Sequence, residues 1–145
     1  MTMLADSQVY TQIGEALSLM GQVPLYANRT LSQLGDLLLP ALAQGQIRVW
    51  KRAAQPVAMA TWAWLDAKTE ALVLECDHVL APNEWCCGDR PVVIDMVAPF
   101  QDGFAVARDL SRNVFAGHTV RAVRRDACGR ARRQSRFHCA TRTTR

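Results

Sequence analysis

One carboxylate interrupts an otherwise apolar stretch in the second half of the chain. Asp95 is the only charged residue between Pro91 and Phe100, and a carboxylate inside a covered strand costs several kcal/mol unless it is paired or hydrogen-bonded. Two interpretations stay open. Backbone amides or an arginine such as Arg90 satisfy a purely structural carboxylate, or the side chain has a tuned pKa and orients or deprotonates a reacting group.

The turn before this stretch holds further groups that could do chemistry. Gly88-Asp89-Arg90 offers backbone amides or a guanidinium to an anion, although such turns are common. Cys86 and Cys87 are candidate nucleophiles. Activation of a thiol needs a neighbouring base or cation, so the sequence favours hydrophobic thiols near a turn.

The number and spacing of the cysteines indicate reduced thiols. An odd number of cysteines in a chain without an export signal argues against a disulfide framework. No C-x-x-C pair or zinc-module spacing occurs, so we predict no metal site. The cysteines are Cys76, Cys86, Cys87, Cys128 and Cys139.

Charge is divided unevenly along the chain. Residues 1–120 hold eight Lys and Arg against twelve Asp and Glu, a net charge of −4, whereas residues 121–145 hold nine Arg against one acidic residue, a net charge of +8. A basic end on an acidic body indicates an acidic partner, which could be nucleic acid, an anionic membrane or an acidic protein.

The arginines near the C-terminus have the spacing of a basic strip. In a strand over 130–137, Arg130, Arg132 and Arg136 share one face, which could bind phosphates or carboxylates. A solvated edge strand, whose charges prevent edge-to-edge pairing, is an equal alternative. Nucleic-acid binding is disfavoured, because Phe137 is the only aromatic residue in this region.

Two amphipathic helices are predicted in the first third of the chain. Helical periodicity covers residues 8–20, and residues 21–30 lack periodicity and are predicted to form a loop. Thr30 can cap a second helix that begins at Leu31. Pro40 either kinks or restarts that helix.

The remaining elements alternate between strands and helices. We predict strands over 47–52 and 57–65, a covered central strand over 91–99, a helix over 104–115 and a final hairpin over 118–138. Residues 67–75 fit a helix or a strand equally well. This order predicts an α+β fold in which helices pack on a mixed sheet.

Length and composition limit the class of protein. The chain of 145 residues is 50% hydrophobic, which suits one core, so we expect a single domain over residues 1–145. The chain contains no apolar run of about 18 residues, so no transmembrane segment is predicted. The first residues lack a secretory signal, so we expect a cytoplasmic protein.

Several blocks of the chain resemble one family. GEALSLM (14–20), LPALAQGQIRVW (39–50), PVAMATWAWL (56–65), NEWCCGDRPVVIDMVAPF (83–100) and VRAVRRDACGRARR (120–133) are similar to the bacterial toxin-activating lysine acyltransferases encoded beside RTX haemolysins. The resemblance spans residues 14–137. Its most specific part is the string Trp85, Gly88, Asp89, Arg90, Asp95, Ala98, Pro99 and Phe100.

The resemblance implies a fold, a reaction and catalytic residues. It implies a GNAT-like fold and transfer of a fatty acyl group from acyl carrier protein (ACP) to internal lysines of an RTX protoxin, with acyl-ACP as co-substrate and no bound cofactor. The family's catalytic Asp corresponds to Asp95. Its S-P-x-H-R pattern falls on residues 23–27, where Tyr26 occupies the place of the catalytic His.

This departure gives an alternative function. A phenol with an ordinary pKa near 10 is a poor base, although Tyr26 could donate a hydrogen bond to the oxyanion. Losing a general base costs about 10²–10⁴-fold in rate. The alternative is therefore a catalytically impaired relative that binds acyl-ACP or toxin without turnover.

The resemblance also gives the basic end of the chain a meaning. ACPs are acidic, so a basic strip would steer and orient them. The acyl-ACP-binding residues that it implies are Arg121, Arg124, Arg130, Arg132 and Arg136. Family members continue into a further helical segment, so residues 138–145 are interpreted as a frayed or truncated end, and a homodimer remains open.

Overall fold

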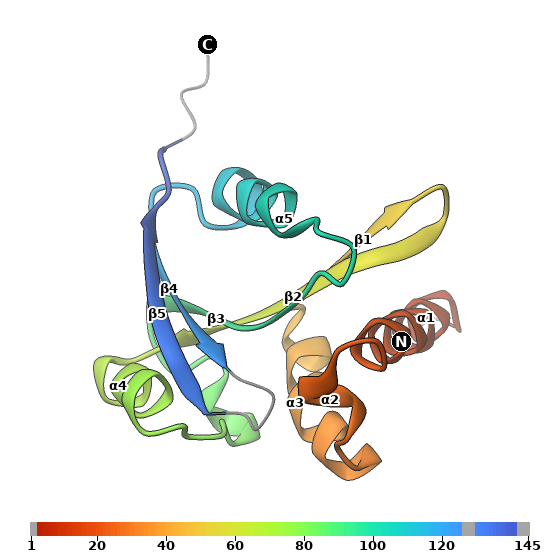
Figure 1. Cartoon of the computed structure of the whole chain (residues 1–145). Helices are drawn as coiled ribbons and strands as arrows, with labels where there is room; N and C mark the ends of the chain where they lie inside the picture. The colour runs from red at the N-terminus through yellow and green to blue at the C-terminus, as the bar shows by residue number, and fades with distance from the viewer. Residues whose placement is uncertain (1–2, 126–129, 142–145) are drawn as a thin grey trace.

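A five-stranded mixed sheet forms the centre of the computed structural model, which describes residues 3–125 and 130–141 (Figure 1). The strand order is β1-β2-β3-β4-β5, and only β3 and β4 are parallel. The predicted α+β fold with a mixed sheet is confirmed. The strands are β1 (Ile47–Arg52), β2 (Gln55–Leu65), β3 (Arg90–Val97), β4 (Thr119–Arg125) and β5 (Ala131–His138).

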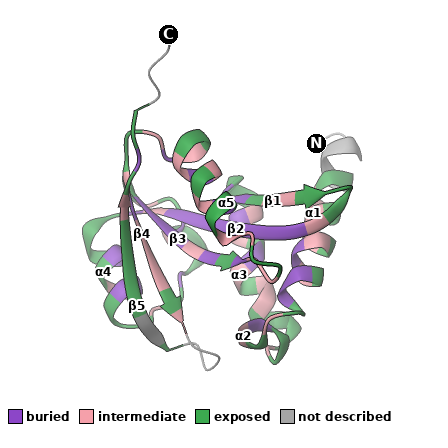
Figure 2. Ribbon diagram, turned by 45° about the horizontal axis from the view of Figure 1, so that its top comes forward, coloured by how far each residue is buried: buried purple, intermediate pink, exposed green. Residues whose placement is uncertain are grey.

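Helices cover both faces of the sheet. In Figure 1, α5 lies on one face and α1 to α4 lie on the other. Both faces of β2 are therefore buried along most of its length, as Figure 2 shows. The helices are α1 (Met3–Met20), α2 (Pro24–Ala27), α3 (Leu31–Gln44), α4 (Ala67–Glu75) and α5 (Gly103–Asp109), with a 3-10 turn η1 (Pro82–Glu84) and a π-helical turn η2 (Leu110–Val114).

Local capping chemistry decides two of the helices. Thr30 and Gln33 form a reciprocal capping box at the start of α3, and the helix continues through Pro40 without restarting. Residues 67–75, which fitted a helix or a strand, form α4. The Asp66 carboxylate accepts a hydrogen bond from the backbone N–H of Thr69 at 2.7 Å, which caps this helix.

The helical segments differ from the sequence predictions at three places, and strand β2 begins at Gln55, two residues before the predicted start, while β3 ends at Val97, two residues before the predicted end. Helix α1 begins at Met3, five residues before the predicted start. The predicted loop 21–30 contains the helical turn α2, because Pro24 occupies its first position, where a missing N–H costs nothing. The predicted helix 104–115 ends as a π-helical turn, in which Phe115 N–H bonds to the Leu110 carbonyl and both side chains are fully buried.

Strands β3 and β4 pair over a very short length. Their only register partners are Val92 with Arg121 and Val93 with Ala122. A parallel pair needs a crossover connection, and α5 with η2 provides it. Beyond Val93 the described residues of the two strands no longer pair, and the part of β3 that holds Asp95 pairs with β2, where Thr61 is its partner.

The β1–β2 hairpin turns through two alanines in the left-handed region, with φ of 50° at Ala53 and 66° at Ala54. Such a turn favours Asn-Gly, because a Cβ in this region costs about 1–2 kcal/mol.

We expect Ala54→Gly to raise the free energy of unfolding by about 1 kcal/mol in urea denaturation. Ala71→Gly, on the exposed side of α4, should lower it by a similar amount. Destabilisation by both variants would contradict the turn geometry.

Candidate active site

A buried hydrogen bond joins the two predicted catalytic residues. The Tyr26 hydroxyl donates to Asp95 Oδ1 at 2.7 Å, although 69 positions separate the residues. The Thr61 hydroxyl lies 3.4 Å from Asp95 Oδ2. Asp95 is thus held by two hydroxyl groups. Arg90, which the sequence offered as its partner, contacts Glu70 Oε1 instead, at 3.2 Å.

Burial shifts the pKa of both partners. It raises the pKa of Asp95, and the hydrogen bonds from Tyr26 and Thr61 offset only part of this effect. Burial also raises the pKa of Tyr26, and the negative charge of Asp95 raises it further. Tyr26 therefore keeps its proton and directs it at Asp95, while Asp95 is a stronger base than an exposed carboxylate.

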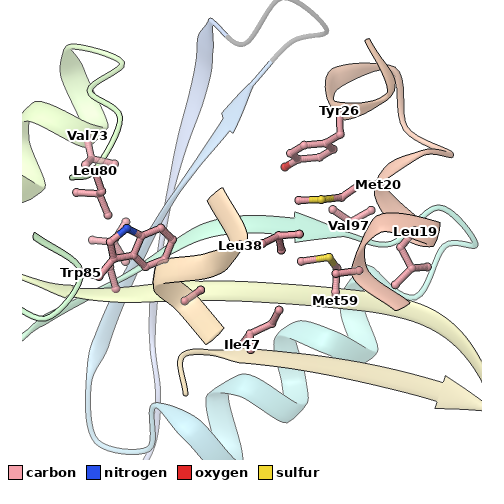
Figure 3. Packing of buried hydrophobic residues seen from close by; sticks show 14 of the residues in the cluster. Leu19, Met20, Tyr26, Leu38, Ile47, Met59, Val73, Leu80, Trp85 and Val97 are labelled. Atoms are coloured by element: carbon pink, nitrogen blue, oxygen red, sulfur yellow. The ribbon is translucent and has the colours of Figure 1, made fainter. Parts of the chain in front are cut away.

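The turn α2 positions the phenol. It begins at Pro24, and the backbone N–H groups of Tyr26 and Ala27 both bond to the Val23 carbonyl. The Tyr26 ring packs in the core beside Met20 and Val97, as Figure 3 shows. An amphipathic side chain can bury its ring in this way only if its hydroxyl finds a partner, and Asp95 is that partner.

A small cavity of about 90 Å³ adjoins the Tyr26–Asp95 pair. Its apolar wall includes Ile94 and Trp85. Two of its charged residues, Arg29 and Arg125, are basic and weakly lower the pKa of Asp95 through their charges. The lining is Leu25, Tyr26, Arg29, Asp36, Leu37, Val73, Asp77, His78, Val79, Leu80, Trp85, Ile94, Asp95 and Arg125.

A larger groove of about 500 Å³ lies where β3 and β4 diverge. Val93, Ile94 and Met96 line it from β3, and residues 122–125 line it from β4. Tyr26 lines both this groove and the small cavity, as do Leu25, Ile94 and Arg125. The two spaces therefore meet beside the buried phenol and carboxylate.

The candidate ACP-binding arginines have different surroundings. Arg124 is exposed and lines the groove, and Arg136 is exposed on β5. Arg121 contacts Glu70 Oε1 at 3.0 Å and is only partly exposed. Arg130 is exposed at the start of the last strand, and the side chain of Arg132 lies outside the described part of the structure.

The Gly88-Asp89-Arg90 turn has a structural role. A Cβ at Gly88 would lie 2.3 Å from the backbone of Leu65 and Asp66, so only glycine fits. Cys86 and Cys87 line neither the cavity nor the groove. The four described cysteines, Cys76, Cys86, Cys87 and Cys139, are free thiols, and Cys128 lies outside the described residues.

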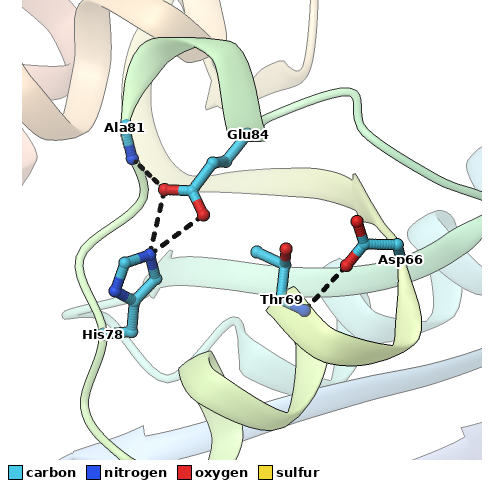
Figure 4. A network of polar contacts seen from close by, with 5 residues as sticks. All are labelled: Asp66, Thr69, His78, Ala81 and Glu84. Carbon is cyan, nitrogen blue, oxygen red and sulfur yellow. Dashed lines mark hydrogen bonds and ion pairs between the residues drawn. The ribbon is translucent and has the colours of Figure 1, made fainter.

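A polar network fixes the segment that forms one wall of the small cavity. Glu84 accepts from the backbone N–H of Ala81 at 2.8 Å and lies 2.9 Å from His78 Nε2 (Figure 4). The Ala81 N–H, and then His78, hold the pKa of Glu84 below its usual value. His78 lines the cavity, so this network shapes the site.

The sequence analysis missed Thr61 and the position of Trp85. Thr61 is the only polar residue between Val57 and Leu65, which is the same signal that singled out Asp95. Trp85 belongs to the family string, but nothing in its spacing shows that it lines a cavity with Asp95. No helix in the described ranges is long and apolar enough to cross a membrane.

Known proteins resemble the chain over most of its length. The pattern of the RTX toxin acyltransferase family matches residues 5–138. The RTX-I toxin-activating lysine-acyltransferase ApxIC of Actinobacillus pleuropneumoniae is 34% identical over 126 residues, covering 87% of this chain and 73% of that protein. The protein-lysine myristoyltransferase HlyC of Escherichia coli is 32% identical over 133 residues, covering 87% and 78%. The family resemblance expected from the sequence is confirmed.

The burial of Asp95 predicts a cost in stability. Its raised pKa means that the charged form is less favourable in the folded than in the unfolded state. Asp95→Asn keeps an oxygen for the Tyr26 hydroxyl without the charge. We expect it to raise the free energy of unfolding at pH 7 by roughly 1 kcal/mol or more, measured by urea denaturation.

The pH dependence of the stability difference between Asp95→Asn and the wild type tests whether the buried charge is its cause. The difference should disappear as the pH falls below the ordinary Asp value of 3.8, where both states are protonated. Asp89→Asn, at an exposed carboxylate, should leave stability unchanged. Destabilisation by Asp95→Asn at pH 7 would show that the buried charge is fully compensated.

Proposed function

Because the chain belongs to the RTX toxin acyltransferase family, we propose that it transfers a fatty acyl group from acyl-ACP to internal lysines of an RTX protoxin. The names of its relatives, a toxin-activating lysine-acyltransferase and a protein-lysine myristoyltransferase, support this reaction class. The observation that carries the proposal is the buried Tyr26–Asp95 pair at the meeting point of a cavity and a groove.

Asp95 is the general base of the proposed reaction. A lysine ammonium cannot attack a thioester, so the acceptor must first lose a proton. Asp95 lines the small cavity, and burial has raised the pKa of its carboxyl above that of an exposed aspartate. Tyr26 serves as a hydrogen-bond donor that orients this carboxylate rather than as a second base, because it keeps its own proton.

The groove between β3 and β4 suits the acyl donor. Its apolar residues, including Val93 and Met96, can cover a fatty chain. Parallel strands that diverge also leave backbone N–H and C=O groups unpaired, and the amide groups of a phosphopantetheine arm can bond to them. This divergence supports the GNAT-like fold, which is part of the proposal.

The basic end of the chain supplies the docking surface for ACP. Arg124 and Arg136 are exposed, and Arg124 lies at the groove itself. Arg130 and Arg132 extend the basic sequence, whereas Arg121 is paired with the buried Glu70. An acidic carrier is attracted to such a surface, and the attraction brings its acylated arm to the groove.

A transfer assay tests the reaction. Purified protein, acyl-ACP and a lysine-containing protoxin segment should give a mass increase of one acyl chain per modified lysine. Asp95→Asn should lower kcat by about 10²–10⁴-fold, because an amide cannot accept the proton. Asp89→Asn, which removes an exposed carboxylate outside both spaces, should keep the wild-type rate.

The same assay decides between the two functions. Absence of transfer by the wild type, together with transfer by Tyr26→His, would show that the chain is the impaired relative. Absence of transfer by every variant would contradict the proposal altogether.

Salt dependence tests the docking surface. Arg124→Ala combined with Arg136→Ala should slow association with acyl-ACP by about 10-fold at low salt. At 1 M salt, where the Debye length is about 3 Å, the difference should vanish. Stopped-flow fluorescence with a labelled carrier measures the association rate at both salt concentrations.

Arg112→Ala combined with Arg108→Ala is the matched control. It removes the same charge from α5 and η2, which cover the opposite face of the sheet from α4. An equal loss in this control would assign the effect to net charge rather than to the surface beside the groove.

A further inference from the structure

The guanidinium of Arg29 has hydrogen-bond donors to spare beside the small cavity. Arg29 lines this cavity, and its Nε donates to the Leu25 carbonyl at 3.1 Å. Within residues 3–125 and 130–141 this is the only hydrogen bond of the Arg29 side chain, and no carboxylate forms an ion pair with it. A guanidinium also carries N–H groups on its terminal nitrogens, and these remain available to a ligand.

The turn α2 fixes the base of this side chain. The backbone N–H of Arg29 donates to the Tyr26 carbonyl at 3.1 Å, and Nε donates to the carbonyl of Leu25. Both acceptors belong to α2, which also directs the Tyr26 phenol at Asp95. The guanidinium is therefore partly oriented before any ligand arrives, which lowers the entropy cost of binding one.

The charge of Arg29 acts on the buried pair. Arg29 and Asp95 line the same cavity, and the positive charge of Arg29 lowers the pKa of both Asp95 and Tyr26. A charge has such effects only at short range, so the guanidinium lies near the pair without bonding to it. Arg29 is also partly exposed, so a molecule that enters the cavity can reach it.

The second basic residue of the cavity is more fully engaged. Arg125 forms an ion pair with Asp77 and also donates to the Val73 carbonyl. Arg29 has no acidic partner of this kind among the described residues. The cavity thus combines a basic carboxylate with a positive charge that no neighbouring acid offsets. Such a site disfavours an ammonium group and favours a ligand on which negative charge develops.

We propose that Arg29 is a catalytic residue whose guanidinium binds the oxyanion formed from the thioester carbonyl. This assignment rests on the proposed function. The lysine nitrogen, from which Asp95 takes a proton, forms a bond to the carbonyl carbon, and the electron pair of the C=O bond moves to the oxygen that Arg29 binds. That pair then restores the C=O bond as the C–S bond breaks. The carrier thiolate leaves with the proton held by Asp95, and the amide remains.

Removing the charge of Arg29 tests this role. We expect Arg29→Gln to lower kcat in the transfer assay by about 10²–10³-fold with little change in KM. Arg29→Lys keeps the charge without the guanidinium fork and should lose less. Arg108→Gln is the matched control, because it removes an exposed arginine from α5 on the other face of the sheet, and it should leave kcat unchanged.

Chemical rescue separates catalysis from a structural role. Dilute guanidinium chloride should restore part of the rate that Arg29→Ala loses, because free guanidinium can occupy the vacated position. Sodium chloride at the same ionic strength should not. Equal responses to the two salts, or an unchanged kcat in Arg29→Gln, would overturn the proposal.

An infrared measurement tests the hydrogen bond without turnover. Acyl-pantetheine with a ¹³C-labelled thioester carbonyl, bound without acceptor, should show a lower carbonyl frequency on the wild type than on Arg29→Gln, with Arg29→Lys in between. Equal frequencies combined with a shifted pH profile of kcat would assign Arg29 to the tuning of Asp95 and overturn its contact with the oxygen. Wild-type protein that shows the lower frequency but transfers no acyl group would overturn the proposed function and leave this contact standing.

Discussion

The hydrogen bond between the Tyr26 phenol and the Asp95 carboxylate is the constraint on which the site depends. A charge in the core needs a donor from within the molecule, since water is scarce there. The donor must come from a separate segment, because the neighbours of Asp95 along β3 are apolar. The turn α2 therefore has to lie against the sheet, where Pro24 starts it and the Tyr26 ring joins the core.

The short pairing of β3 with β4 creates the space around this bond. Continuous pairing would close the sheet beside Asp95 and leave no groove. Instead, β3 stays attached to β2 through the Thr61–Asp95 pair, which also supplies a hydroxyl to the carboxylate. The same register thus holds the Asp95 carboxylate in place at the wall of the small cavity.

The sequence predicted the helices and strands better than it predicted which side chains contact one another. Apolar periodicity located β1 and the covered strand β3, because periodicity reports burial directly. It did not separate helix from strand at residues 67–75, where the Asp66 cap decided the outcome. It offered Arg90 as the partner of Asp95, although Arg90 turns to Glu70. Packing determines which side chains from distant parts of the chain come into contact. The spacing of residues within one segment does not predict these contacts.

The buried Glu70 of α4 binds Arg90 at the start of β3 and Arg121 on β4. One carboxylate thus clamps the two strands at the end where they are still hydrogen-bonded, immediately before the groove opens. The separation of the strands is fixed at that end and increases away from it. In the proposed function, a fatty chain in the groove would lie where the strands separate, so the position of the clamp would set how far the chain can extend toward the paired end.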